Sequence, residues 1–416
     1  MTNIYVDQIS PRIQYAFDFI FGSRGLTYKL TQDQSEKVDL IYSGQKEDEG
    51  IRQADFMQHD RIDDLEVKVD SFYGQECFSF DGVPDPVASI FYVLSRYEEY
   101  NCNQADEYGR FPLKASKLSR DWLMKAMCDR WAEAVLNVVG VPLNKEYNVR
   151  IIPSFDIDNT YAYKLKTGKR KLLSVLRDML RFDFNRMKER REVLSGRKKD
   201  PYDTFQKIRE VRKQFPDTKV FWLIGKWGKK DRNISIKNNT HRELISSLSS
   251  EGIDIGLHPS FGSFQQRGVI EEERNELRSV CGKPVSISRQ HYLRFQVAST
   301  FSDLEAIGFT DEYSMGFAEH VGFRSGTVRP HCWFDLSTNR VTNLVIHPFI
   351  YMDGTLREYM HLSIEQSKAV IEDLYREVKR YGGDFVFIWH NETIGDYGNW
   401  KGWSEVLDFT LSLGHE

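Results

Sequence analysis

The chain has 416 residues, a formal net charge of −4, and five scattered cysteines with no Cys-x-x-Cys pair. The negative charge argues against bulk electrostatic binding to nucleic acid, and the cysteine pattern argues against a disulfide framework or a thiolate zinc site. The length allows two or three domains, or one barrel with an appendage. Because no signal peptide and no apolar run of membrane-spanning length is visible, we expect a cytoplasmic protein without a transmembrane segment.

Residues 1–145 mix short strand patterns with helical ones, which predicts a small α/β domain. One helix opens at Pro86, a residue favoured at the first helical position. The sequence does not indicate a role for this domain. The predicted elements are strands at 38–42 and 66–69, helices at 85–100 and 120–139, and a linker at 141–144.

Residues 147–416 alternate strand and helix patterns, which predicts βα units around a parallel sheet. Two of the helices begin with a capping-box pattern, Thr240 to Glu243 and Ser363 to Gln366, and end at glycines. A third, shorter helix is predicted at 300–308.

A segment rich in Lys and Arg, at about 160–216, interrupts this alternation. Its apolar residues form a stripe within 172–187, which indicates a helical hairpin with a solvated basic face. The alternative is a platform for an anionic surface, such as a lipid-linked glycan at a membrane, so peripheral membrane contact through this segment stays open.

Six apolar runs in the last two-thirds of the chain each end at a polar residue that is capable of chemistry. In an α/β barrel the reactive groups lie at the carboxyl ends of the strands, so such residues converge on one pocket. The runs are 150–155 before Asp156 and Asp158, 253–257 before His258, 285–288 before Arg289 and His291, 321–323 before Arg324, 344–346 before His347, and 385–389 before His390.

The two aspartates are the strongest local signal. Alternation along a strand sends Asp156 and Asp158 to the same side, where one carboxylate could bind a metal and the other act as a general base. An Asp-rich turn is the alternative. His258 ends a buried strand, as zinc-binding histidines often do, or it hydrogen-bonds a loop.

The run from Arg289 to Tyr292 and the residue His390 supply further candidates. Arg289 could orient a carboxylate or form a purely structural ion pair, and His291 could reach a metal. The main-chain N–H of Tyr292 could face an oxyanion. His390 ends a very apolar strand and is suited to general acid work, although a lone histidine there can also be structural.

The order of these pieces resembles the NodB-like polysaccharide deacetylases, carbohydrate esterase family 4, and within them a divergent Bacteroidetes-type subgroup with an added N-terminal domain. The resemblance covers about residues 147–410. The matching stretches are Ser154 to Asp158, Lys219 to Gly225, Glu251 to His258, Arg289 to Tyr292, 304–309 with Asp311, and Phe387 to His390.

The chain departs from the family pattern at three points. Ile157 separates the two aspartates, no second histidine follows His258, and His291 stands where the family has proline. We therefore expect His291 to replace the missing ligand, which gives Asp158, His258 and His291 as the metal site. His347 is a rival ligand or a substrate-binding residue, and Arg324, Asp353 and Trp389 are further pocket candidates.

The resemblance implies an α/β fold, a NodB-type partial (β/α)7 barrel at 147–416 preceded by the small α/β domain. It implies metal-dependent removal of an acetyl group, N-acetyl in preference to O-acetyl, from an acetylated oligo- or polysaccharide, such as a surface-polysaccharide precursor. Zinc is favoured by ligand type, with cobalt, nickel or manganese as alternatives. The family roles fall on Asp156 as base, His390 as acid, Arg289 as the partner of Asp156, and Tyr292 as oxyanion donor.

Two other interpretations remain open at this point. A degenerate, metal-free barrel could bind a glycan or a protein partner without catalysis, because a fold is often reused for binding. A metal-dependent amidase acting on a non-sugar substrate would use the same site. The oligomeric state is not indicated by the sequence.

Overall fold

The computed structural model describes residues 1–45, 50–141, 148–180 and 182–415. The chain forms two compact units that are each built from separate stretches of sequence. Unit 1 comprises residues 1–150, 293–351 and 372–385, and unit 2 comprises residues 151–292, 352–371 and 386–416. The division into domains at 1–145 and 147–416 stays a prediction, and the expected linker, apart from Val141, lies outside the described residues.

Unit 1 is an α/β structure with two small sheets near its N-terminal end and a large apolar core between their helices. The predicted strands at 38–42 and 66–69 correspond to β3 and β5. The parallel sheet has the order β2 (Tyr28–Thr31), β1 (Thr2–Val6), β3 (Leu40–Ser43), β4 (Ile51–Arg52), and the antiparallel one has β5 (Val67–Phe72), β6 (Gln75–Phe80), β7 (Val83–Pro84). The helices of the core are α1 (Pro11–Ile20), α2 (Pro86–Leu94) and α5 (Met127–Val138).

The two long helices predicted in this region are each divided in two. The helix expected at 85–100 is α2 followed by α3 (Tyr97–Tyr100), because Arg96 adopts a left-handed conformation with φ 55°. The buried Arg96 guanidinium binds Glu98 and Glu99 at 2.7 Å each, which holds this break. The helix expected at 120–139 is α4 (Arg120–Leu123) followed by α5.

The remainder of unit 1 contains α11 and three strands in the order β13, β14, β12. The predicted strand before His347 is the end of β14, but the strand predicted at 321–323 is wrong. There the N–H groups of Gly322 and Phe323 donate to the carbonyls of Ile350 and Leu123, so they are not available to a strand ladder. The bounds are α11 Val297–Ile307, β12 Asp311–Glu312, β13 His331–Asp335 and β14 Arg340–Ile346.

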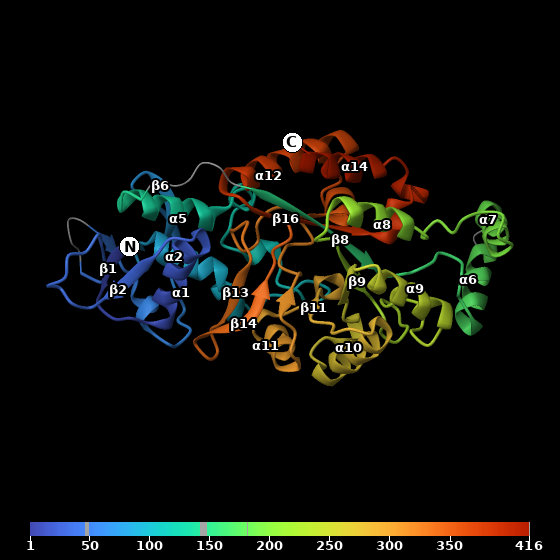
Figure 1. Cartoon of the computed structure of the whole chain (residues 1–416), viewed down its shortest axis with the longest axis horizontal. Coiled ribbons are helices and arrows are strands. Elements are labelled where there is room, and N and C mark those ends of the chain that lie inside the picture. Colours follow the sequence, from blue (N-terminus) through green and yellow to red (C-terminus); the bar gives the residue numbers. More distant parts are fainter. Residues whose placement is uncertain (46–49, 142–147, 181, 416) are drawn as a thin grey trace. The chain divides into compact units, whose positions relative to one another are not determined.

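Unit 2 contains the parallel βα arrangement of a partial (β/α) barrel (Figure 1). β8, β9, β10 and β11 pair in parallel as successive neighbours, and β16 lies on the other side of β8. Helices connect each strand to the next. The strands are β8 (Val149–Ile157), β9 (Lys219–Trp222), β10 (Asp254–Leu257), β11 (Ile287–Ser288), β15 (Tyr351–Met352) and β16 (Gly383–His390). The helices are α8 (Phe205–Gln214), α9 (Asn239–Ser250), α10 (Arg267–Cys281), α12 (Ile364–Tyr381), α13 (Asn391–Ile394) and α14 (Ser404–Ser412).

One predicted capping box is confirmed and the other is wrong. At the start of α12, Gln366 N–H donates to Ser363 Oγ at 3.2 Å and Ser363 N–H donates to Gln366 Oε1 at 2.9 Å. At the start of α9, by contrast, the side chain of Asn238 accepts the N–H of His241 at 3.1 Å, so the helix begins before the expected Thr240.

The basic segment at 160–216 folds into three helices, not only into a hairpin. α6 (Gly168–Leu180) and α7 (Phe184–Leu194) form the predicted hairpin, whereas α8 buries Phe205, Ile208 and Val211 just before β9. Within the described parts of the chain, no helix combines the length and apolar character that crossing a membrane requires.

Candidate metal centre

Three strands of unit 2 bring residues at or just after their ends to one place. Asp156 is the penultimate residue of β8 and Asp158 follows it, His258 follows β10, and His390 is the last residue of β16. Close packing of the strands requires Gly256 in β10, because a Cβ atom there would lie 2.6 Å from the ring of Phe221. Parallel strands therefore bring these side chains to a common edge, as in other α/β barrels.

Asp158, His258 and His291 lie close enough to hold one metal ion, with a potential ligand atom from each within 4.8 Å of the others. His258 Nε2 is 3.2 Å from Asp158 Oδ1, and His291 Nε2 is 3.4 Å from Asp158 Oδ2. Ligands that bind zinc tetrahedrally at about 2 Å lie roughly 3.3 Å apart. The separations of these donors thus match those of a small divalent cation site.

The outer nitrogens of both imidazoles are already engaged. His258 Nδ1 hydrogen-bonds the main-chain oxygen of Arg289, and because a carbonyl can only accept, this nitrogen carries the proton. His291 Nδ1 is 2.9 Å from Asp231 Oδ1. Such partners fix the ring orientation and leave Nε2 directed at the site, as they do for metal-binding histidines.

A direct test of the fit is the contact between His258 and Asp158. Both His258 Nε2 and Asp158 Oδ1 are buried and have no hydrogen-bond partner in the described chain, although they lie 3.2 Å apart. With the proton of a neutral His258 on Nδ1, two electron-pair donors face each other here. This arrangement is favourable only with a proton or a cation between them, so the residues fit a divalent metal ion.

The electrostatics of the three residues favour bound positive charge. Desolvation would raise the pKa of Asp158, but the imidazoles of His291, His258 and His390 outweigh it and hold this pKa well below its usual range. Desolvation would conversely lower the pKa of His291, yet Asp158 and Asp231 raise it to about 9. The carboxylates and imidazoles of this group thus favour each other's charged forms, and the carboxylates favour positive charge beside them.

Asp156 lies next to the three potential ligands but is held by a different residue. Its Oδ1 accepts a hydrogen bond from the buried Arg289 guanidinium at 2.8 Å, and its Oδ2 is 3.9 Å from His258 Nε2. The guanidinium also lies over the ring of Phe221, 4.3 Å from its centroid. Arg289 therefore neutralises and orients Asp156, and the two aspartates reach the same side of β8.

His390 is oriented by the fully buried Asp353. The Asp353 carboxylate accepts hydrogen bonds from His390 Nδ1 at 2.8 Å, from His390 N–H at 2.9 Å, and from the hydroxyl of Thr393 at 2.5 Å. His390 Nε2 then lies 3.9 Å from Asp158 Oδ2. Burial opposes the charged imidazolium, but Asp353, Asp158 and Asp156 raise the pKa of His390 well above its usual value.

Sequence reasoning missed two residues of this site and gave a third a different role. Asp231 and Glu392 were not singled out, and Asp353 was expected in the substrate pocket and not as the partner of His390. Glu392 is half-buried, and desolvation together with the charge of Asp158 raises its pKa to about 7. Only its position two residues after His390 could have indicated it.

Tyr292 has an unusual backbone conformation. Its φ of 62° and ψ of 12° lie in the left-handed region, which is costly for a residue with a large side chain. Its ring contacts that of His291 at 4.6 Å between centroids and that of Phe261 at 5.4 Å. The role of its main-chain N–H as an oxyanion donor stays a prediction.

The three remaining pocket candidates are buried or paired with other side chains. Trp389 is fully buried in β16. Arg324, in unit 1, makes two hydrogen bonds of 2.8 and 2.9 Å to the buried Glu99. His347, also in unit 1, binds Asp311 at 2.8 Å and stacks on Tyr313.

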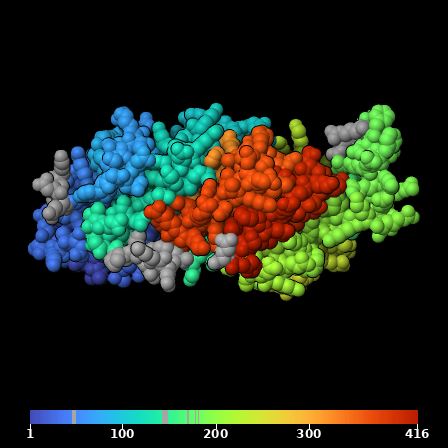
Figure 2. All heavy atoms as spheres, turned by 90° about the horizontal axis from the view of Figure 1, so that it is seen from above, coloured from blue at the N-terminus to red at the C-terminus, as the bar shows by residue number. Residues whose placement is uncertain are grey.

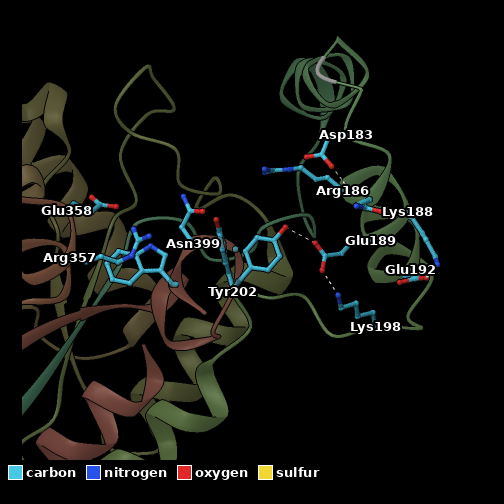
Figure 3. Close-up of a pocket in the computed structure, with 14 residues that line it drawn as sticks. Asp183, Arg186, Lys188, Glu189, Glu192, Lys198, Tyr202, Arg357, Glu358 and Asn399 are labelled. Atoms are coloured by element: carbon cyan, nitrogen blue, oxygen red, sulfur yellow. Dashed lines mark hydrogen bonds and ion pairs between the residues drawn. The ribbon is translucent and has the colours of Figure 1, made fainter. Parts of the chain in front are cut away.

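Several cavities of about 400 to 650 Å³ occur in unit 2, and two of them differ in how they relate to the candidate site. One, of about 560 Å³, adjoins the candidate site through Asn159 and Glu392, and Trp227 and several basic residues line its other walls. The other, of about 650 Å³, lies between α7 and the segment around Arg357 and Trp400, and none of the residues discussed above as potential ligands line it (Figure 3). The cavity of about 560 Å³ is thus lined by Asn159 and Glu392, which are close in sequence to Asp158 and His390.

Comparison with known proteins gives weak likenesses. The model of a family of unknown function, DUF7033, matches residues 2–141. No curated protein matches the chain. Similar solved structures are a protein from Mycobacterium smegmatis assigned as a polysaccharide deacetylase (TM-score 0.41, 14% identity, 66% of this chain and 86% of that one), the polysaccharide deacetylase Bc1974 from Bacillus cereus (0.30, 10%, 64% and 86%), and the PuuE allantoinase (0.38, 12%, 64% and 84%). The interpretation of the site therefore depends on its own geometry.

Proposed function

We propose that this protein is a metal-dependent hydrolase that removes an acetyl group from a carbohydrate, an N-acetyl group in preference to an O-acetyl group. The observation that carries the proposal is the convergence of Asp158, His258 and His291 beside a carboxylate held by Arg289 and an imidazole held by Asp353. The sugar substrate is supported by the resemblance of the sequence motifs to those of polysaccharide deacetylases.

Asp158, His258 and His291 would hold the ion, and two imidazoles with one carboxylate favour zinc, with cobalt, nickel or manganese as alternatives. When bound, such an ion supplies a Lewis acid and lowers the pKa of water to about 7. Its fourth position would be left for water and substrate, because the described residues offer three protein ligands.

The side chains next to the triad have complementary proton-transfer roles. Asp156 accepts a proton from the attacking water as the oxygen–carbon bond forms, and the hydrogen bond from Arg289 orients this carboxylate. His390 donates a proton to the leaving nitrogen as the carbon–nitrogen bond breaks, and Asp353 keeps its Nδ1 occupied. The main-chain N–H of Tyr292 donates to the oxyanion. The products are acetate and a free amino sugar.

The substrate would enter the cavity that contains Asn159 and Glu392. The indole of Trp227 is half exposed there and offers a face on which a sugar ring can stack. The substrate would be an acetylated oligosaccharide or polysaccharide, such as a surface-polysaccharide precursor. The cytoplasmic location stays a prediction.

The test combines metal analysis with product analysis. Protein purified without added chelator is expected to contain close to one zinc-type ion per chain, and to release acetate from chitooligosaccharides faster than from O-acetylated xylan. The control is Asp156→Asn, which should keep the metal and lose acetate release. A protein that contains no metal after reconstitution, releases no acetate and still binds the oligosaccharides in calorimetry would be the non-catalytic binder, and the proposal would be abandoned.

A further inference from the structure

The hairpin formed by α6 and α7 exposes an unusual amount of apolar surface. Among the described residues, sixteen large apolar side chains are exposed, and eight of them lie between residues 172 and 194. Leu180 is 79% exposed, Phe182 77% and Phe184 71%. A concentration of exposed apolar side chains of this kind indicates a surface that contacts a protein or a membrane. The eight are Leu172, Leu173, Leu176, Met179, Leu180, Phe182, Phe184 and Leu194.

The orientation of α6 is the reverse of that in an ordinary surface helix. Leu172, Leu176 and Leu180 recur at intervals of four and form one exposed face. The opposite face carries Ser174 and the buried Asp178, and both hydrogen-bond the guanidinium of Arg190 on α7. The helix thus buries its polar side through an ion pair and leaves its apolar side exposed. The spheres of this segment, in green, lie at the surface in Figure 2.

The inner side of the hairpin already packs against the rest of unit 2, so the exposed apolar residues cannot be buried there. Val193 of α7 lies in a small buried cluster with Ala162 and Tyr163. Glu189 of α7 accepts hydrogen bonds from the hydroxyls of Tyr163 at 2.9 Å and Tyr397 at 2.7 Å. It also pairs with Lys198, as Figure 3 shows. These contacts fix which side of the hairpin faces outward.

The charge of the segment indicates which kind of binding partner is complementary to this apolar face. Residues 160–199 contain fourteen Lys and Arg but only four Asp and Glu, in a chain whose net charge is −4. Lys171 of α6 and Lys188 of α7 are exposed beside the apolar residues. An amphipathic helix with exposed Leu and Phe flanked by Lys and Arg is complementary to a bilayer that contains anionic lipids.

We propose that the α6–α7 hairpin docks on the surface of an anionic lipid bilayer and inserts its apolar residues at the level of the headgroups. Leu173 and Ser174 of α6 also line the cavity that contains Asn159 and Glu392. A saccharide carried on a membrane lipid would therefore enter this cavity from the docked face. This substrate class, a lipid-linked acetylated saccharide, rests on the proposed function, whereas docking itself does not.

Flotation with vesicles of defined composition tests docking directly. The full chain is mixed with vesicles of phosphatidylcholine alone or with 30% phosphatidylglycerol, on the order of the anionic fraction that makes a polybasic segment bind. Binding is expected with the anionic vesicles, with a strong decrease on adding salt, and little binding is expected with the neutral ones.

Two pairs of variants separate the apolar and the basic contributions. Leu176→Asp/Leu180→Asp should weaken vesicle binding about a hundredfold, whereas Val69→Asp/Val341→Asp, at exposed apolar positions outside the hairpin, should bind like the parent. Lys171→Glu/Lys188→Glu should weaken binding more than about tenfold, and Lys37→Glu/Lys117→Glu should not. Circular dichroism and thermal unfolding check that each variant is folded.

Three results would overturn the proposal. The first is that the parent does not bind anionic vesicles. The second is that the hairpin variants and the control variants lose vesicle binding to the same extent. A dimer that dissociates only in Leu176→Asp/Leu180→Asp, with no vesicle binding by the parent, would assign the face to a second copy instead. His258→Ala should float like the parent, so a failure of docking can be told apart from a failure of the metal-dependent activity.

Discussion

His258 Nδ1 hydrogen-bonds the main-chain oxygen of Arg289, while the side chain of the same arginine binds Asp156 at 2.8 Å. One residue thus orients a potential metal ligand through its main chain and a potential general base through its guanidinium. Both contacts follow from its position just after β11, next to the end of β10. Because the carbonyl does not depend on the side chain, substitution can separate the two contacts.

Arg289→Met should retain the metal and lose activity. The carbonyl that binds His258 remains, so metal affinity should change less than about tenfold, whereas acetate release should fall on the order of 10²-fold or more because Asp156 loses its partner. An uncompensated buried carboxylate should also destabilise the fold by about 3–5 kcal/mol. Asp156→Leu/Arg289→Met should recover much of that stability without activity. Equal losses of metal and activity in the single variant would contradict this account.

His258→Ala should abolish metal retention, whereas His347→Ala should not. His258 contributes one of three clustered ligand atoms, so its removal should cost more than the roughly 10- to 100-fold seen when only a ligand's partner is lost. His347 is paired with Asp311 and stacked on Tyr313 instead. Metal per chain is measured by mass spectrometry after desalting, with circular dichroism as the check on folding. Retention by His258→Ala would remove the ligand assignment.

Asp231→Asn should weaken metal binding about 10- to 100-fold, because Asp231 fixes the orientation of the His291 ring. Affinity can be measured by competition with a chromogenic chelator. Asp311→Asn is a matched control, since it changes the corresponding Asp–His contact with His347 in unit 1. If both variants bind metal like the parent, Asp231 does not position a metal ligand.

The candidate ligands could be predicted from sequence because they share one simple feature, a position at the end of an apolar strand. Parallel strands end at the same edge, so Asp158, His258 and His291 meet although 133 residues separate the first from the last. Asp231 carries no such signal. It lies in a loop outside any strand, and its contact with His291 depends on the path of that loop.

Errors elsewhere have a common physical cause, which is tertiary contact that overrides local pattern. The apolar spacing of 85–100 favours one helix, but the ion pairs of Arg96 with Glu98 and Glu99 hold a left-handed residue in the middle. The apolar run at 321–323 resembles a strand, yet the N–H groups of Gly322 and Phe323 bind carbonyls that are distant in sequence. Neither kind of partner can be read from a window of neighbouring residues.

Asp353→Asn should lower kcat by about 10²- to 10⁴-fold without loss of metal. Both carboxylate oxygens of Asp353 accept hydrogen bonds, among them one from His390 Nδ1. In Asp353→Asn one oxygen becomes an NH₂ group, which faces a donor where an acceptor was needed, so the imidazole of His390 is no longer held. Acetate release at saturating substrate gives kcat, and metal analysis gives occupancy. If the two residues act as one unit, the double variant Asp353→Asn/His390→Asn should be no slower than the slower of the two single variants. Additive losses would show that Asp353 acts elsewhere.

The buried His331 of unit 1 should make the fold less stable as the solution becomes acidic. Burial lowers the pKa of His331 to about 4, below a value of about 6.5 in the unfolded chain. A histidine with a depressed folded pKa contributes stability that is present above the unfolded pKa and is lost as pH falls toward the folded one. The window is therefore pH 6.5 to 4, and the loss is on the order of 3 kcal/mol.

Urea unfolding at intervals across that window tests this expectation. His331→Asn keeps an N–H donor for the carbonyl of Arg329 but has no imidazole to protonate, so its stability should fall less steeply with acid than that of the parent. His361→Asn, at an exposed position, is the matched control and should follow the parent profile. Parallel profiles for the parent and His331→Asn would mean that other groups bind the protons taken up on unfolding, because linkage requires the steeper slope in the protein that retains the buried imidazole.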